Sequence, residues 1–175
     1  PVYDNLVSVV DASVVRPGSS SLPFDFPSII GAANTNSGTI LVYPNDDYTA
    51  ATYSEQVALY NKDDRKIISA CGTDLTIISS SGDTIIVQDS ANLVVDGFSI
   101  TSTKTGSGVY INRVDSTTIT FKNNMVYDNT HGFYINDSDN LPVEIDSVEI
   151  FSNSTRGITL MNSDDDVNIN NCEIH

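Results

Sequence analysis

Basic residues are scarce in this sequence of 175 residues: eight lysines and arginines stand against 23 aspartates and glutamates, a formal net charge of -15. A chain of that sign repels nucleic-acid phosphates and anionic membranes, so we expect neither as a partner. No stretch approaches the roughly 20 consecutive apolar residues that a membrane span requires. The first ten residues also lack the basic start of a signal peptide. The length suits one domain with a continuous core.

Cysteine is also rare, with only Cys71 and Cys172. The repeat described below places them about four rungs apart, which is roughly 19 Å at about 4.8 Å per rung. Because a disulfide requires Cα atoms within about 7 Å of each other, we expect no bridge between them. Two N-x-[ST] tripeptides, at Asn136 and Asn153, fit a secreted protein, but such tripeptides arise often by chance in a chain this rich in Asn, Ser and Thr.

The abundant residues are Asn, Ser, Thr and Asp, which favour strands and tight turns over helices. They are arranged in a repeat of about 24 residues, with segments that start at Gly108, Gly132 and Gly157. Apolar positions recur in step in three columns: Ile119, Val143 and Val167; Phe121, Ile145 and Ile169; Val126, Ile150 and Ile174. Apolar and polar residues alternate within each segment, as in a strand with one face in the core. The columns therefore predict stacking inside a parallel solenoid.

Corner residues punctuate the repeat. At the three repeat glycines we expect either a positive φ or a lack of room for a Cβ atom. The pairs Asn123-Asn124 and Asn170-Asn171 are typical of corners, because Asn tolerates the left-handed region and bonds to backbone. We interpret these asparagines as structural.

Ahead of the repeat, the sequence predicts two parts: an N-terminal strand with a flexible tether over 1–21, and a β-helix domain over 22–175. In the second part we expect a capping helix at about 27–34, because the end of a solenoid needs a cover, and an uncapped C-terminal end. We interpret residues 48–64 as a surface loop. The N-terminal strand is a candidate for assembly by addition to another subunit, through Leu6, Val7, Val9, Val10, Val14 and Val15.

The order of segments beginning PSIIGAANTNSGTILVYPNDDYT and continuing through KIISACGTDLTIIS, NLVVDGFSIT, TITFKNNMVYDN and VNINNCEI resembles the pectate-lyase-like superfamily of right-handed parallel β-helices. The resemblance is closest to NosD-like repeats of carbohydrate-binding and sugar-hydrolysing domains, and it covers about 26–175. It implies an all-β, right-handed parallel β-helix. The superfamily includes polysaccharide lyases, hydrolases and epimerases together with tailspikes, adhesins and non-catalytic surface proteins, so the resemblance alone does not select a function.

Catalysis in such a family requires carboxylates that converge on one outer face, with Ca²⁺ in the lyases. Here the acidic groups are scattered over corners and loops: 46–47, 63–64 and 164–166. The family's recognisable hydrolase and lyase motifs are absent. We therefore predict no cofactor and no metal, with Ca²⁺ implied only for a lyase, and the balance leans against an enzyme.

One constellation favours chemistry. His131 and Arg156 each precede a repeat glycine, so they are expected to lie one above the other about 5 Å apart, with Ser107 one rung below. A His beside an Arg suits acid–base chemistry on a uronate sugar, and the His-Gly step resembles that of alginate epimerase-like β-helices. Two exposed corner residues would explain the same pattern. Similarly, Arg113 and Asp137 are expected to form a surface ion pair between rungs.

The leading interpretation is a structural module at the cell surface or outside the cell: a subunit or fragment of a fibre, stalk or adhesin that self-associates or continues the solenoid. One alternative is a lyase or epimerase acting on an acidic polysaccharide through His131 and Arg156. Another is a non-catalytic glycan-binding module that uses Tyr110 and Tyr134, one rung apart, because tyrosine rings stack on sugars.

Overall fold

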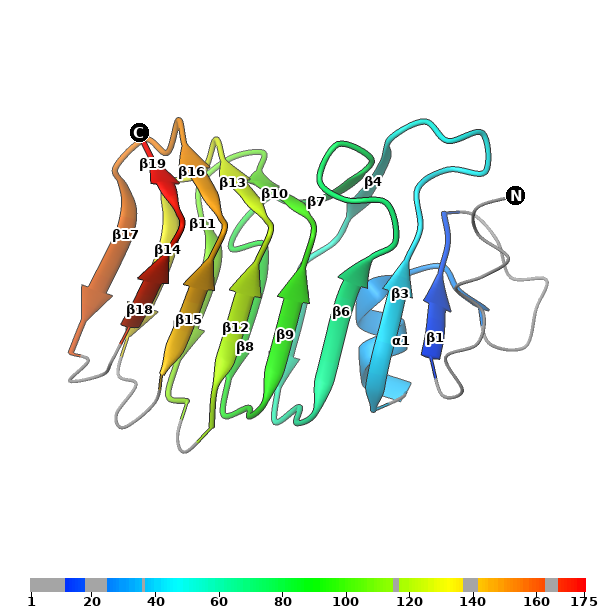
Figure 1. The fold of residues 1–175 in the computed structure, drawn as a ribbon, viewed down its shortest axis with the longest axis horizontal. Coiled ribbons are helices and arrows are strands. Elements are labelled where there is room, and N and C mark those ends of the chain that lie inside the picture. The colour runs from blue at the N-terminus through cyan, green and yellow to red at the C-terminus, as the bar shows by residue number, and fades with distance from the viewer. Residues whose placement is uncertain (1–11, 18–24, 36, 115–116, 137–141, 163–166) are drawn as a thin grey trace.

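The computed structural model describes residues 12–17, 25–35, 37–114, 117–136, 142–162 and 167–175. Within these residues, all strands belong to three sheets, here called A, B and C (Figure 1). Sheet A contains β1 (Ala12–Val15), β2 (Asp25–Phe26), β3 (Gly38–Val42), β6 (Arg65–Ser69), β9 (Leu93–Asp96), β12 (Ile119–Lys122), β15 (Val143–Asp146) and β18 (Val167–Asn170). Sheet B contains β4 (Ala51–Ser54), β7 (Thr76–Ser80), β10 (Ser99–Ser102), β13 (Met125–Tyr127), β16 (Glu149–Phe151) and β19 (Glu173–Ile174). Sheet C contains β5 (Val57–Tyr60), β8 (Ile85–Gln88), β11 (Ser107–Asn112), β14 (His131–Asn136) and β17 (Arg156–Met161).

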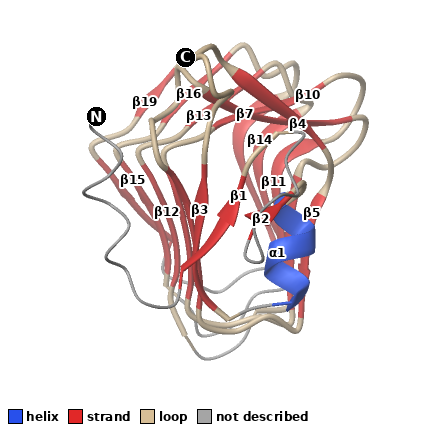
Figure 2. Ribbon diagram, turned by 90° about the vertical axis from the view of Figure 1, so that its right-hand side faces the viewer, coloured by secondary structure: helices blue, strands red, loops and turns tan. Residues whose placement is uncertain are grey.

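From β3 onward the chain winds as a solenoid in which each complete rung adds one strand to every sheet, whereas β1 and β2 extend sheet A alone (Figures 1 and 2). Neighbouring strands of a sheet are parallel and come from successive rungs. The predicted columns are confirmed in register: Ile119 pairs with Val143, Phe121 with Ile145 and Val126 with Ile150. Because the spacing of apolar residues matches the length of a rung, each rung buries its inward side chains on the next one.

Alternating side chains of the three sheets fill the interior. The largest fully buried residues include Phe98, Phe121 and Phe133. The rings of Phe121 and Phe133 meet edge to face, with their centroids 5.3 Å apart. Full burial of such a side chain contributes about 1.5–3 kcal/mol, so the stacked columns are the main source of stability.

The corner between sheets A and B repeats one backbone conformation. Gly97, Asn123, Ser147 and Asn171 stand at this corner in successive rungs, and all four have a positive φ, at 83°, 52°, 55° and 52°. This confirms the expectation for Asn123 and Asn171. Asn124 is buried instead: its Oδ1 accepts the Phe98 N–H at 2.9 Å and its Nδ2 donates to the Val95 carbonyl at 3.0 Å.

Glycine is required at the three repeat positions because there is no room for a Cβ atom, and the φ of these glycines is not positive. A Cβ on Gly108 would lie 2.5 Å from Cγ1 of Val126, and one on Gly132 would lie 2.4 Å from the carbonyl oxygen of Gly157. Of the two reasons that the sequence left open, close approach is therefore the correct one.

A short helix, α1 (Ile29–Thr35), lies at the N-terminal end of the solenoid beside β1 and β5 (Figure 2). It begins where the Ser28 hydroxyl accepts the Gly31 N–H at 3.1 Å, the pattern of an N-cap. The carboxylate of Glu55 accepts the N–H groups of Ile29 and Ile30 at 2.8 and 3.0 Å. Glu55 thus supplies two partners that the first turn of a helix lacks.

Two expectations about the N-terminal third were wrong. Residues 48–64 are not merely a surface loop, because they contain β4 and β5, which pair with β7 and β8 as a regular rung. Val14 and Val15 are not on a detached strand, since β1 pairs with β3 of the same chain and Val15 is fully buried. The solenoid therefore starts before residue 22. Leu6, Val7, Val9 and Val10 lie outside the described residues.

The C-terminal rung is open on one side. Its inward side chains are about half exposed: Leu160 at 49%, Ile169 at 46% and Ile174 at 49%. The equivalent residues one rung earlier are fully buried. Cys71 and Cys172 are both partly buried thiols. In the described part of the chain, no helix is long and apolar enough to cross a membrane.

Candidate functional site

His131 and Arg156 lie in one column of sheet C. The backbone of His131 pairs with that of Arg156 on one side and with Ser107 on the other. Ser107 is buried, His131 is partly exposed and Arg156 is exposed. The predicted juxtaposition is therefore present in the backbone.

The side chain of His131 is held by its neighbours. Its Nδ1 lies 2.9 Å from the Thr159 hydroxyl, and its ring meets the ring of Tyr134 edge-on at 5.2 Å between centroids. Thr159 is itself only 5% exposed. No described carboxylate lies within 4.0 Å of the charged nitrogens of His131 or Arg156. The site thus has a possible base and a cation, but among the described residues no acid that would orient them.

Tyr110 and Tyr134 stack on each other on the outer face of sheet C. Their ring centroids are 5.7 Å apart and the planes are inclined by 22°. Burial, and after it the negative charge of Asp83, raises the pKa of Tyr110. Because the two rings cover each other's facing surfaces, and Ile86 stands one rung before Tyr110, sugar stacking on these faces would need the rings to part. The arrangement accounts for both residues as packing.

The two tripeptide asparagines both bond to neighbouring rungs. Asn136 donates from Nδ2 to Oδ1 of Asn112 at 3.0 Å. Asn153 is more deeply engaged, because its Nδ2 donates to the Val126 carbonyl at 3.1 Å while its Oδ1 accepts both the backbone N–H and the Nδ2 of Asn129, at 3.1 and 3.0 Å. The amide nitrogen that a glycan would modify is thus already used in the fold.

The acidic loop pairs also have structural partners. Asp47 Oδ1 accepts the hydroxyl and the N–H of Thr49, at 2.6 and 3.2 Å, and these bonds lower the pKa of Asp47. Asp63 Oδ1 accepts the N–H of Ala91 at 2.9 Å. Within the described ranges no group of three or more His, Cys, Asp or Glu side chains is placed to hold a metal ion. The third run, 164–166, lies outside those ranges.

The surface ion pair of Arg113 is formed with the preceding rung. Its guanidinium lies 3.0 Å from Oδ2 of Asp89. Hydrogen bonds from Gln88 and then from Arg113 lower the pKa of Asp89. The sequence placed this pair with Asp137, which lies outside the described residues.

The structure contains two features that the sequence reasoning missed. One is a polar hollow of about 310 Å³ lined by Ser54, Glu55, Gln56, Ser80, Ser81 and Gly82, but the carboxylate of Glu55 already binds α1.

The second feature is a column of rings on the outer face of sheet B. Tyr127 and Phe151 stack with ring centroids 5.1 Å apart and planes inclined by 9°, and Phe151 and His175 stack with centroids 5.8 Å apart. Their exact 24-residue spacing was a usable signal.

The geometry defines the class as a parallel β-solenoid with three sheets and a helix at one end. The family model of the right-handed beta helix region matches residues 34–175. The chain belongs to this family, and the predicted right-handed parallel β-helix is confirmed. No curated protein and no solved structure was found to match the chain.

Proposed function

We propose that the chain is a structural module at the cell surface or outside the cell, a subunit or part of a fibre, stalk or adhesin. The observation that carries this proposal is the use of the outer side chains as ladders between rungs. These ladders include an asparagine pair at 3.0 Å, a tyrosine pair, a Tyr–Phe–His column, and the Arg113–Asp89 and Lys122–Asp96 ion pairs. Contacts of this kind between outer side chains hold successive rungs together, which suits a stiff structural module.

The candidate catalytic residues support the same proposal. The contacts of His131 with Thr159 and Tyr134 hold the imidazole in the ladder of sheet C. An acid–base site on a uronate would also need a positive charge beside the negatively charged sugar carboxylate, and among the described residues of this column the arginine available, Arg156, is exposed. A lyase or epimerase activity is therefore the weaker hypothesis.

The open C-terminal rung supports a role in which β-structure continues. Leu160, Ile169 and Ile174 present apolar surface, and the outer edges of β17, β18 and β19 have no neighbouring strand in the described residues. Unpaired strand edges favour pairing with further strands. A following rung of the same polypeptide or a second copy would both cover this surface.

A size measurement tests the structural role. We expect the chain as given to self-associate with rising concentration in sedimentation velocity, and Ile169→Lys to abolish this association by placing a charge on the open rung. Val94→Lys is the matched control, because Val94 is a partly exposed apolar residue on the outer face of sheet A. Monomeric wild-type protein at all concentrations would count against assembly through this end.

A turnover assay tests the enzymatic alternative. The chain is incubated with alginate and with pectin, with and without Ca²⁺, and the products are examined for unsaturated sugars and altered uronate composition. We expect no turnover. Turnover that His131→Ala and Arg156→Ala abolish would establish the lyase or epimerase instead.

A further inference from the structure

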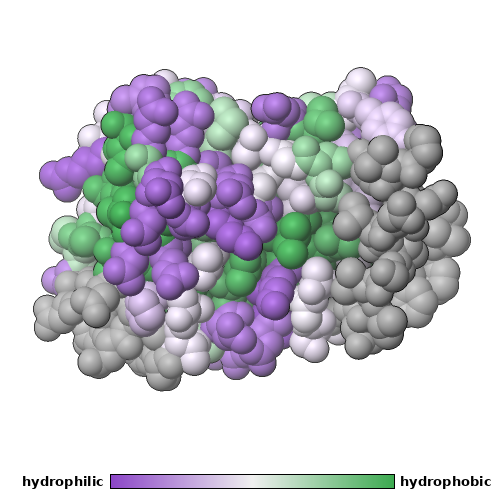
Figure 3. All heavy atoms as spheres, in the orientation of Figure 1, coloured by the Kyte–Doolittle hydropathy of each residue, from purple (hydrophilic) through white to green (hydrophobic). Residues whose placement is uncertain are grey.

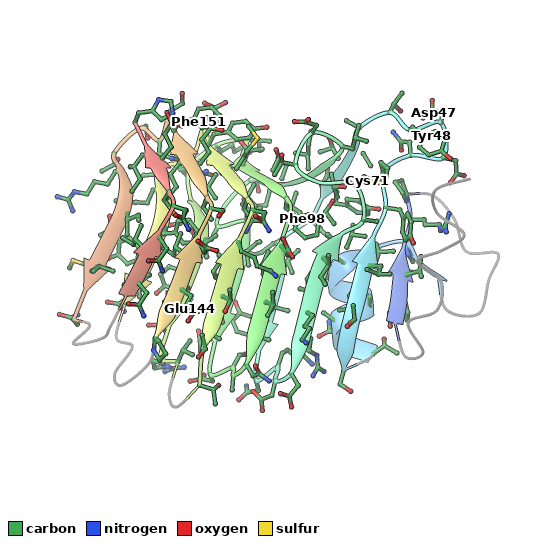
Figure 4. The ribbon with its side chains drawn as sticks, viewed as in Figure 1. Asp47, Tyr48, Cys71, Phe98, Glu144 and Phe151 are labelled. Atoms are coloured by element: carbon green, nitrogen blue, oxygen red, sulfur yellow. The ribbon has the colours of Figure 1, made fainter. Side chains whose placement is uncertain are left out.

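The ring column on sheet B lies on the outside of the C-terminal rungs. Tyr127 of β13 and Phe151 of β16 are on the outer face and are partly exposed, and His175 follows β19. Figure 4 shows Phe151 at the outside of the C-terminal rungs. The earlier members of this column are small or polar, since Thr101 pairs with Tyr127 and Ser79 pairs with Thr101. Within this column the aromatic rings are thus confined to the last rungs, although the apolar Ile77 also lies on the outer face of β7.

Two carboxylates flank this column. Glu149 and Glu173 are directly opposite each other in neighbouring strands, two residues before Phe151 and His175 on the same face. Like charges at such positions are unfavourable. The sole described basic group nearby is His175, with Nε2 at 3.6 Å from Glu149 Oε1, and both side chains are substantially exposed, at 58% and 42%. No strand of sheet B contains a lysine or an arginine.

Three described carboxylates of sheet A have a polar partner on a neighbouring rung, whereas on sheet B the ion pair of Glu149 is with the exposed His175. Lys122 lies 3.2 Å from Asp96, Asp146 accepts Nδ2 of Asn171 at 2.9 Å, and Glu144 accepts the Thr120 hydroxyl at 3.3 Å. Figure 3 looks onto this sheet and shows hydrophilic residues spread across it, with apolar residues among them. Glu144 and Asp146 of β15 therefore serve as the control for Glu149 and Glu173: the two pairs carry the same charge, but both carboxylates of β15 already accept a hydrogen bond.

The geometry of the ring column restricts what it can bind. Stacking within the column covers the ring faces of Phe151 on both sides, so mainly ring edges meet the solvent. A sugar stacks on a ring face, and a cation is also attracted to the face. Ring edges still offer apolar contact to the aliphatic stem of a lysine or arginine, whose charged head would then reach a carboxylate beside the rings.

We propose that Tyr127, Phe151, Glu149 and Glu173 form a docking surface for a basic peptide segment of a partner protein. The stems of its arginine or lysine side chains lie across the ring edges, and their heads neutralise the two opposed glutamates. Charge complementarity supports this occupant, because the chain has a formal net charge of -15 and the strands of sheet B contain no lysine or arginine. The surface is distinct from the His131 column, and it includes the outer face of the open rung at Glu173, whereas the apolar side chain of Ile174 points inward.

The test measures binding of a fluorescein-labelled octa-arginine peptide by fluorescence anisotropy. Any polycation is attracted to so acidic a chain, so the comparison is between two double variants of equal charge. We expect Glu149→Gln/Glu173→Gln to weaken binding about tenfold and Glu144→Gln/Asp146→Asn on sheet A to weaken it by no more than about twofold. Equal losses for the two would overturn the proposal.

An uncharged substitution tests the rings. Phe151→Ser is expected to weaken peptide binding severalfold, whereas Val94→Ser on sheet A is expected to leave it unchanged, with circular dichroism confirming that both variants are folded. Unchanged binding by folded Phe151→Ser would overturn the role of the rings. Binding of chitosan oligomers that depends on Glu149 and Glu173, without such a dependence for the peptide, would overturn the assignment to a peptide.

Discussion

A single added methyl group at Gly132 is expected to disrupt the stacking of the rungs. A Cβ at this position would lie 2.4 Å from the Gly157 carbonyl oxygen and 2.7 Å from Cγ2 of Ile150. The first contact is with the backbone of the next rung, which cannot move without breaking its hydrogen bonds. Overpacking of this kind costs about 1–3 kcal/mol or more, and the reduced freedom of the unfolded chain returns only about 0.4–1 kcal/mol.

The expected net loss for Gly132→Ala is about 2 kcal/mol, which corresponds to a fall in Tm of about 4–8 °C for a domain of this size. The assay is thermal unfolding followed by circular dichroism. Gly82→Ala is the control, because a Cβ there has nothing within 4 Å and the φ of Gly82 is not in the left-handed region. If both variants unfolded at the wild-type temperature, close approach would not be the reason for the glycine at 132.

Two further substitutions and one modification test probe the fold. Glu55→Gln should cost about 1–2 kcal/mol and speed hydrogen exchange of the Ile29 and Ile30 amides that the carboxylate binds; unchanged exchange would show that α1 does not depend on the charge. Burial raises the pKa of Tyr53, so the tyrosine ionises first in the unfolded chain, and the free energy of unfolding falls as pH rises above about 10. In urea titrations, Tyr53→Phe should be less stable than the wild type at pH 7, because it lacks the hydrogen bond to the Tyr43 carbonyl, but its stability should fall less at alkaline pH. An equal fall for both proteins would refute this. In a glycosylating host, mass spectrometry should find Asn153 unmodified in folded protein, because its amide is bonded to Val126 and Asn129, whereas a glycan there would contradict that assignment.

The regular rungs could be predicted from the sequence because one period controls both pattern and packing. Ile119, Val143 and Val167 are 24 residues apart and stand in register. The repeat glycines Gly132 and Gly157, which follow His131 and Arg156 directly, correctly placed these two residues side by side in the backbone at an interval of 25. The repeat gave no information on side-chain partners such as Thr159, which bonds to His131 from the next rung.

The first rungs were harder to predict, because their spacing differs from 24. Leu41 pairs with Ile68, and Ile68 with Asp96, at intervals of 27 and 28 residues. Because these intervals are longer than 24, the repeat pattern did not predict β4, β5 or the pairing of β1 with β3. Capping by Glu55 depends on a contact between residues 25 and 26 positions apart, which no local pattern reveals.

Electron microscopy of the purified chain tests the proposed structural role most directly. The account predicts end-to-end association of the solenoids in the wild type, and isolated short particles in Ile169→Lys. Isolated particles in both preparations, at concentrations where sedimentation would detect association, would contradict assembly through the open rung. So would association that Ile169→Lys leaves unchanged.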